Sequence, residues 1–243
     1  MVGVEFQRAR NDEQRSQRRR HILDVTAAML AEMPVAKLSL NELSRRVGLA
    51  KANVLRYFES REAILLQLLD AELTDWLTGL EEPLSVPAEG ASRERGDRLA
   101  RVLADSLAER PVLCDLISAQ AAVLERNVSA EVAREHKYAT LRSYRTLARL
   151  IANQLPELGQ EDTFRLTGLL SLVAGGTWPY IQPSQDLLAA YPDDPIVAAM
   201  HVDFADVVRQ SLEVAISGLL FRAENVPLGA RPVGAVPSGD ALA

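Results

Sequence analysis

The stretch Ser39–Phe58, SLNELSRRVGLAKANVLRYF, decides the fold at the start of the chain. Ser39, followed three residues later by Glu42, predicts a capping box, in which each side chain satisfies an exposed backbone N–H at the start of a short helix. Gly48 predicts the end of that helix, because glycine tolerates the left-handed conformation that reverses the chain. A second short helix is expected from about Lys51 to Phe58. Two short helices joined by a tight glycine turn predict a helix-turn-helix.

The second of these helices is expected to have one buried face and one open face. A small core beneath it would be formed by Leu43, Val47, Leu49 and Val54. The open face would carry Lys51, Ala52, Asn53, Arg56 and Tyr57. Lysine and asparagine read base edges in the major groove of DNA, and arginine and tyrosine hold phosphates or bases. Any helical hairpin shows the same apolar pattern, so the pattern alone also allows a purely structural hairpin.

Two longer helices flank this unit. Apolar residues at steps of three and four predict an amphipathic helix from Arg18 to Met33, which ends at Pro34 because the residue before a proline is pushed out of the helical region. Ser60 predicts the cap of a longer helix that reaches about Thr78. Residues 1–14 are polar and are expected to form a disordered arm.

Charge is uneven along the chain. Residues 1–61 carry 12 Lys and Arg against 7 Asp and Glu, whereas the other 182 residues carry 15 against 26. A basic head on an acidic body is typical of a nucleic-acid reader with a separate body domain. The alternative is a solvated basic tail, because the cluster of arginines before residue 21 alone produces much of the asymmetry.

Composition excludes several classes of protein. The 243 residues contain no apolar run near the roughly 20 needed to cross a bilayer, and the polar start of the chain has no signal-peptide core. A single Cys114 excludes a disulfide framework. His21, His136 and His201 lack metal-ligand spacing, and no catalytic motif is present. We therefore expect a cytoplasmic protein that is neither an enzyme nor dependent on a metal or cofactor.

Three segments resemble the N-terminal domain of TetR-type (tetracycline-repressor-like) regulators: ILD at 22–24, LNELSRRVGLAK at 40–51 and RYFESREAI at 56–64. The resemblance covers roughly residues 15–70 and implies that residues 15–61 bind double-stranded DNA. The chain departs from the family pattern at Ala50, Leu55 and Tyr57. Since the family usually has hydroxyl side chains at the first two positions, phosphate contacts are expected to shift to Ser39, Arg56 or Arg61. Arg61 stands where the family commonly has a lysine beside the DNA backbone.

Residues 62–223 are expected to form an all-α body that binds a ligand and dimerises. A loop over Glu81–Gly96 is predicted from its prolines and glycines. Residues 224–243 are expected to be a disordered tail. Between them helical patterns cover about 97–109, 111–125, 129–154, 161–178 and 201–222.

The last two of these helices are apolar nearly all round, so they must be buried on several sides. A second subunit would cover them in a four-helix interface, as the resemblance also implies for a homodimer. Alternatively, both helices lie at the centre of a monomer. A dimer would place two recognition helices about 34 Å apart, at the pitch of a pseudo-palindromic operator.

The residues that line a ligand pocket are weakly marked. Candidates are Trp76, Gln120, Tyr144, Trp178 and Tyr180, with Cys114 and His136 as further possibilities. Each of these is also compatible with ordinary packing. The segment Gly175–Tyr180, GGTWPY, joins two glycines and a proline to two aromatics, which suits a pocket wall or a contact at the dimer seam equally.

The hypothesis from the sequence is a dimeric transcription regulator, a repressor released from its operator by a small-molecule effector. The helix from about Ser60 to Thr78 would act as a lever, because it belongs to the head yet continues into the body. Alternatives with the same head are a transcription activator and a DNA-binding protein that responds to no ligand.

Overall fold

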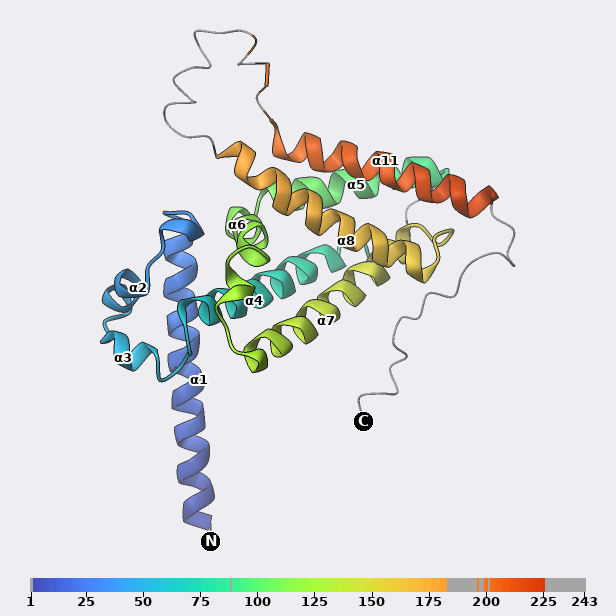
Figure 1. Ribbon diagram of the computed structural model, residues 1–243. Helices are drawn as coiled ribbons and strands as arrows, with labels where there is room; N and C mark the ends of the chain where they lie inside the picture. Colours follow the sequence, from blue (N-terminus) through green and yellow to red (C-terminus); the bar gives the residue numbers. More distant parts are fainter. Residues whose placement is uncertain (1, 88, 183–195, 197–198, 201, 226–243) are drawn as a thin grey trace.

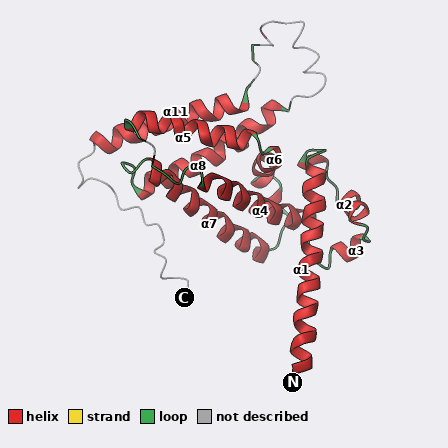
Figure 2. Cartoon of the chain, turned by 180° about the vertical axis from the view of Figure 1, so that it is seen from behind, coloured by secondary structure: helices red, strands yellow, loops and turns green. Residues whose placement is uncertain are grey.

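The computed structural model describes residues 2–87, 89–182, 196, 199, 200 and 202–225, and these residues contain helices and no strand (Figures 1 and 2). A head of three helices lies beside a larger helical body, which confirms the predicted all-α class. The elements of the head and the junction are α1 (Val2–Leu30), η1 (Val35–Lys37), α2 (Leu40–Val47), α3 (Lys51–Val54) and α4 (Arg61–Glu81). The elements of the body are α5 (Ser92–Ala108), α6 (Pro111–Gln120), η2 (Leu124–Arg126), α7 (Ala130–Gln154), α8 (Gln160–Thr177), η3 (Trp178–Ile181) and α11 (Phe204–Asn225).

Helix α1 is longer than the sequence pattern suggests. It begins at Val2, so residues 2–14 are helical where a disordered arm is expected. The apolar period that marks a buried helix starts only near Ile22, and it gives no signal for the exposed part. No proline or glycine interrupts the chain between Val4 and Met33, and glutamate, glutamine, arginine and alanine are good helix formers. Figure 1 shows this part of α1 projecting beyond α2 and α3.

The helix-turn-helix forms as its capping residues indicate. The Ser39 hydroxyl accepts a hydrogen bond from the Glu42 amide at 3.1 Å, and Gly48 adopts φ 73° at the turn. The second half of the capping box is absent, because the Glu42 carboxylate accepts from Arg45 instead. Helix α3 ends at Val54, and its turn continues through the amides of Tyr57 and Phe58, which both donate to the Val54 carbonyl.

The helix predicted over about 97–109 begins earlier in the structure. Helix α5 starts at Ser92 and contains Gly96, which the predicted loop over 81–96 included. Gly96 is there because helices α5 and α11 approach closely: a Cβ at this position would lie 2.7 Å from Ile216 Cγ2. Gly175 has a similar role between α8 and α6, where a Cβ would lie 3.2 Å from Ile117 Cγ2. Glycines at these positions serve close packing rather than a chain reversal.

One continuous core joins the head and the body. Leu43 and Val54 are fully buried in the head, as predicted, and α4 contributes Ile64, Leu65 and Leu69 to the same core. Helix α4 then continues between α6 and α7. The helix that the sequence predicts from about Ser60 to Thr78 therefore forms as one unbroken helix of 21 residues. The predicted tail over 224–243 lies outside the described residues from 226 onwards.

Candidate nucleic-acid interface

The recognition helix α3 presents the face that the sequence predicts. Ala50, Lys51, Ala52, Asn53 and Arg56 are exposed, whereas Val54 and Phe58 are buried beneath them. Tyr57 is half-buried, and Ser39 is exposed at the start of α2. The geometry thus places a lysine, an asparagine and an arginine on one open surface, where side chains of these types read base edges and hold phosphates.

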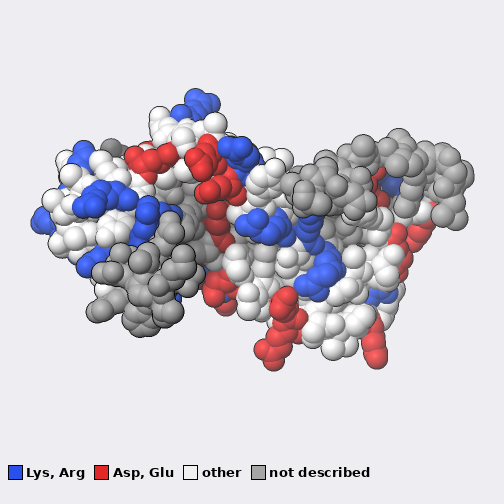
Figure 3. Space-filling model, turned by 90° about the horizontal axis from the view of Figure 1, so that it is seen from below, with Lys and Arg blue, Asp and Glu red and all other residues white. Residues whose placement is uncertain are grey.

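The cations of the head fall into two groups. Arg45 pairs with Glu42 and Arg46 with Glu32, both at 2.5 Å, so these two charges are satisfied within the head. In contrast, no hydrogen bond or ion pair joins the side chains of Lys51 and Arg56 to any residue that the structure describes. Figure 3 shows lysines and arginines spread over the head lobe at the left, and acidic side chains along its boundary with the body. The uncompensated positive charge therefore lies on the α3 side of the head.

Arg61 is placed differently from the expectation. Its guanidinium donates to the Val35 carbonyl at 2.5 Å and pairs with Glu62 at 3.1 Å, and its side chain is only 19% exposed. The sequence suggested an external anion as the partner of a cation at this helix start. The actual partners are a backbone carbonyl and the neighbouring carboxylate, which the sequence pattern does not reveal. Arg61 thus ties α4 to η1 instead of lying free beside DNA.

Val35 is a joint between head and body. While its carbonyl accepts from Arg61, its amide donates to the Asp115 carboxylate of α6 at 2.6 Å. Burial raises the pKa of Asp115; the hydrogen bond from Val35 and the nearby Trp178 indole, which lies outside regular hydrogen-bond geometry, oppose this effect. A second link runs from the Ser129 amide to Glu59 at 2.6 Å. Carboxylates therefore join the two parts at two places.

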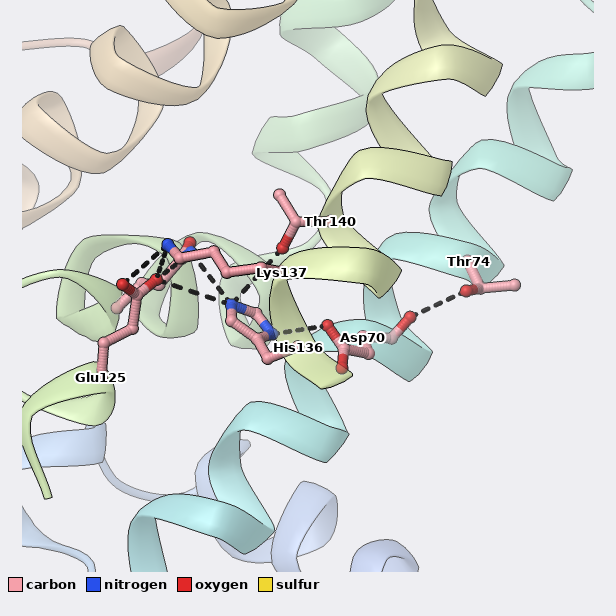
Figure 4. Close-up of polar contacts among 7 residues, drawn as sticks. Asp70, Thr74, Glu125, His136, Lys137 and Thr140 are labelled. Carbon is pink, nitrogen blue, oxygen red and sulfur yellow. Dashed lines mark hydrogen bonds and ion pairs between the residues drawn. The ribbon is translucent and has the colours of Figure 1, made fainter. Parts of the chain in front are cut away.

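A buried histidine lies where α4 and α7 meet (Figure 4). The side chain of His136 is 1% exposed, and its Nδ1 lies 2.8 Å from Asp70 Oδ1 on α4. Its Nε2 lies 3.0 Å from Gln120 Nε2 and 3.7 Å from Glu125 Oε1. Burial alone would raise the pKa of Glu125, but hydrogen bonds from Lys137 and Gln120 lower it overall. This polar cluster joins α7 to α4.

A groove of about 900 Å³ runs between α1, α4 and α7 next to this cluster. Its lining mixes apolar side chains such as Leu23, Phe58 and Leu66 with polar and charged ones such as Asp70 and His136, and the polar and charged residues are the more numerous. The groove spans the head and the body at the point where α4 passes from one to the other.

The five predicted ligand residues do not meet in one place. Trp76 donates to Ser106 on α5, Tyr144 packs edge-on against Phe164, and Trp178 packs edge-on against Phe204. Tyr180 is 71% exposed. Gln120 alone reaches the groove described above, and it does so through His136. The side chains of Trp76, Tyr144 and Trp178 therefore take part in ordinary packing, because each aromatic ring lies in a different contact between helices. Cys114 is also buried, which raises the pKa of its thiol to about 12 and leaves it unreactive.

The outer face of α8 and α11 is apolar and open to solvent. Leu172 is 75% exposed and Val214 is 74% exposed, although the two helices pack against each other. Two adjoining hollows of about 310 and 510 Å³ share Leu169, Val214 and Ala215. An apolar patch of this kind marks an interaction site on a protein surface. On their other faces both helices lie in the core of the single chain, where Leu170, Val208 and Leu212 are buried.

The described residues provide neither a metal site nor a membrane-spanning helix. They contain no cluster of three or more His, Cys, Asp or Glu side chains arranged to hold a metal ion. None of their helices combines the length and apolar character that a membrane crossing requires.

The helix-turn-helix, its open cationic face and the helical body define a DNA-binding regulator of the all-α class. Comparison with family models supports both parts of this description. Residues 22–68 match the model for bacterial regulatory proteins of the tetR family, and residues 70–223 match the tetracyclin repressor-like C-terminal domain. The chain belongs to the TetR family of transcriptional regulators, which confirms the resemblance seen in the sequence, and this family is not enzymatic.

Solved structures share the fold at low sequence identity. A TetR transcriptional regulator from Rhodococcus sp. RHA1 is 16% identical, with a TM-score of 0.54, over 86% of this chain and 97% of that one. The fatty acid degradation regulator FadR from Bacillus halodurans is 14% identical, with a TM-score of 0.52, over 82% and 98%. No curated protein matches the chain closely enough to count as a relative.

Proposed function

We propose that this protein is a homodimeric repressor that binds a pseudo-palindromic DNA operator and releases it when a small-molecule effector binds the body. The observation that carries the proposal is the open face of α3, where Lys51, Asn53 and Arg56 are exposed without a partner among the described residues. Buried Val54 and Phe58 hold that face rigidly. Lys51 and Asn53 would read base edges in the major groove, and Arg56, Tyr57 and Ser39 would hold the phosphates beside it.

A second copy of the chain would cover the α8–α11 face. Burying Leu172 and Val214 in a four-helix contact removes apolar surface from water at about 25 cal/mol per Å². The same contact would set two copies of α3 about 34 Å apart, which is one turn of DNA. Dimerisation and operator spacing thus depend on the same helices.

The effector would act through the junction. Helix α4, the Asp115–Val35 link and the Glu59–Ser129 link connect the head to the body. A ligand that fits the body better when α4 is tilted would shift the population toward heads that no longer match successive grooves. The groove beside His136 is the proposed effector site, because a ligand there would touch α1, α4 and α7 together.

The experiment is selection of genomic fragments by the purified full chain, followed by footprinting of the enriched fragments. The expected result is a shared sequence with two inverted half-sites, centred about 10 base pairs apart or a multiple of that spacing. Transcription from such a promoter should fall when the protein is added and recover with the effector. Enrichment of fragments with no common sequence would contradict the proposal, and higher transcription with the protein would identify an activator.

A further inference from the structure

A polar trough lies beside the recognition helix, on the side of α1. It has a volume of about 840 Å³. Arg15, Arg18 and His21 line it from α1, and Arg56 and Tyr57 line it from the end of α3. The sequence predicted a disordered arm over residues 1–14 and a helix from Arg18, with a solvated basic tail as the alternative for the arginines before residue 21. The structure places Arg15, Arg18 and His21 on one continuous helix beside α3.

The cations of the trough have no partner among the residues that the structure describes. Arg15, Arg18 and Arg56 are exposed, and among the side chains that the structure describes no carboxylate pairs with them. Their charges therefore differ from those of Arg45 and Arg46, which Glu42 and Glu32 compensate. Arg15 and Arg18 are three residues apart, so they share one face of the helix.

Arg19 keeps α1 in place against α3. Its guanidinium donates to the Tyr57 carbonyl and to Gln67 Oε1, and it lies 4.3 Å from the centre of the Phe58 ring. Burial and the neighbouring Arg15 lower the pKa of Arg19. Arg19, which is itself half-buried, thus joins the two walls of the trough and sets the position of α1 relative to α3.

We propose that this trough holds the sugar–phosphate backbone of the DNA strand that borders the groove entered by α3. The inference rests on the proposed function, and it adds a second contact surface to it. Its position beside α3 favours a duplex, because a protein held on DNA by the recognition helix brings a phosphate strand along this side. Fixed arginines on two walls suit a line of phosphates, and backbone contacts of this kind set the register of a protein on its site.

The test compares two double variants of the full chain by fluorescence anisotropy with a labelled duplex of about 30 base pairs and arbitrary sequence. Arg15→Ala/Arg18→Ala removes two charges from the trough. Arg20→Ala/Lys37→Ala removes the same charge from exposed positions of the same head that do not line it. Affinity is measured over a series of salt concentrations, because each lost phosphate contact lowers the slope of log K against log salt by about one.

The expected result is a slope lower by about two for the trough variant and nearly unchanged for the control. Arg15→Lys/Arg18→Lys should restore most of the slope, because a lysine still neutralises a phosphate as a point charge. Equal slopes for the two double variants, with DNA binding intact, would show that the trough does not hold the DNA backbone. The proposed function would then still stand. Failure of the wild-type chain to bind any duplex would overturn both. Circular dichroism of each variant confirms that the helices are intact.

Discussion

Two exposed surfaces of this protein differ in chemistry. The α1–α3 surface carries cations that no carboxylate of the described residues pairs with, among them Arg15, Lys51 and Arg56. The α8–α11 surface carries large apolar side chains such as Leu172 and Val214. Both are left unsatisfied by the single chain, because charge without a counter-charge and apolar area without cover each favour a partner. We therefore propose a different partner for each surface: a polyanion for the first and a second copy of the chain for the other.

The contrast also predicts a different response to salt. Binding at the cationic surface releases counterions and weakens steeply as salt rises. Contact at the apolar surface depends on buried area, and excluded salts such as sulfate strengthen it.

Leu172→Glu/Val214→Glu should abolish the dimer. Two carboxylates buried in an apolar contact without partners cost several kcal/mol, which raises the dissociation constant by three orders of magnitude or more. Sedimentation velocity would show a single species of 26.6 kDa at concentrations where the wild type is a dimer. Val86→Glu is the matched control, because Val86 is also 74% exposed but lies in the loop between α4 and α5 and lines neither hollow of the α8–α11 face. A dimer that survives the double substitution would place the interface elsewhere.

Lys51→Ala should weaken operator binding by about 1–3 kcal/mol and leave binding to random DNA nearly unchanged, if Lys51 reads a base edge. Lys37→Ala is the control on the same head, because Lys37 is exposed on η1. Titration of the selected operator and of a scrambled duplex under the same salt separates the two effects. Equal losses on both duplexes would reassign Lys51 from base reading to phosphate binding.

The fold of the head was predictable because local rules determine it. The Ser39 cap, the Gly48 turn and the buried Val54 each depend on residues within one or two turns of helix, and together they fix which side of α3 is open. The apolar α8 and α11 were predictable for the same reason. A helix without an apolar period, as in residues 2–14, gives no such signal.

The partners of long side chains were not predictable. Arg61 reaches Val35, which is 26 residues away in sequence, and His136 reaches Asp70, which is 66 residues away. The ligand candidates failed to converge for a related reason: an aromatic residue in a helical pattern looks the same whether it fills a helix contact or lines a pocket. Only the packing of the body helices distinguishes a ring that fills a helix contact from a ring that lines a pocket.

Arg61→Ala tests whether this cation belongs to the DNA surface or to the junction. Since its guanidinium already donates to Val35, the salt slope of DNA binding should not change, whereas a phosphate contact would lower it by about one. The free energy of unfolding should fall by about 1 kcal/mol. The loss is modest because the Val35 carbonyl also accepts from the Leu38 amide and because Arg61 Nε itself is buried without a partner. Urea denaturation and anisotropy on the same preparation measure both quantities.

Asp115→Asn should change the free energy of unfolding least of all these substitutions. It should also change how that free energy depends on pH. Because burial raises the pKa of Asp115, the folded state favours the protonated carboxyl, and the stability from this group is present below the unfolded pKa and is lost as pH rises through the folded one. Asparagine keeps an oxygen for the Val35 amide and carries no charge. Its free energy of unfolding at pH 7 should therefore equal or slightly exceed that of the wild type, by less than about 1 kcal/mol, and the difference should vanish near pH 4. Asp115→Ala, which leaves the Val35 amide without its acceptor, should be less stable at both pH values. If asparagine lowers the free energy of unfolding as much as alanine at pH 7, the negative charge of Asp115 itself stabilises the junction. The Asp115–Val35 hydrogen bond would then be an electrostatic contact between head and body and not a neutral one.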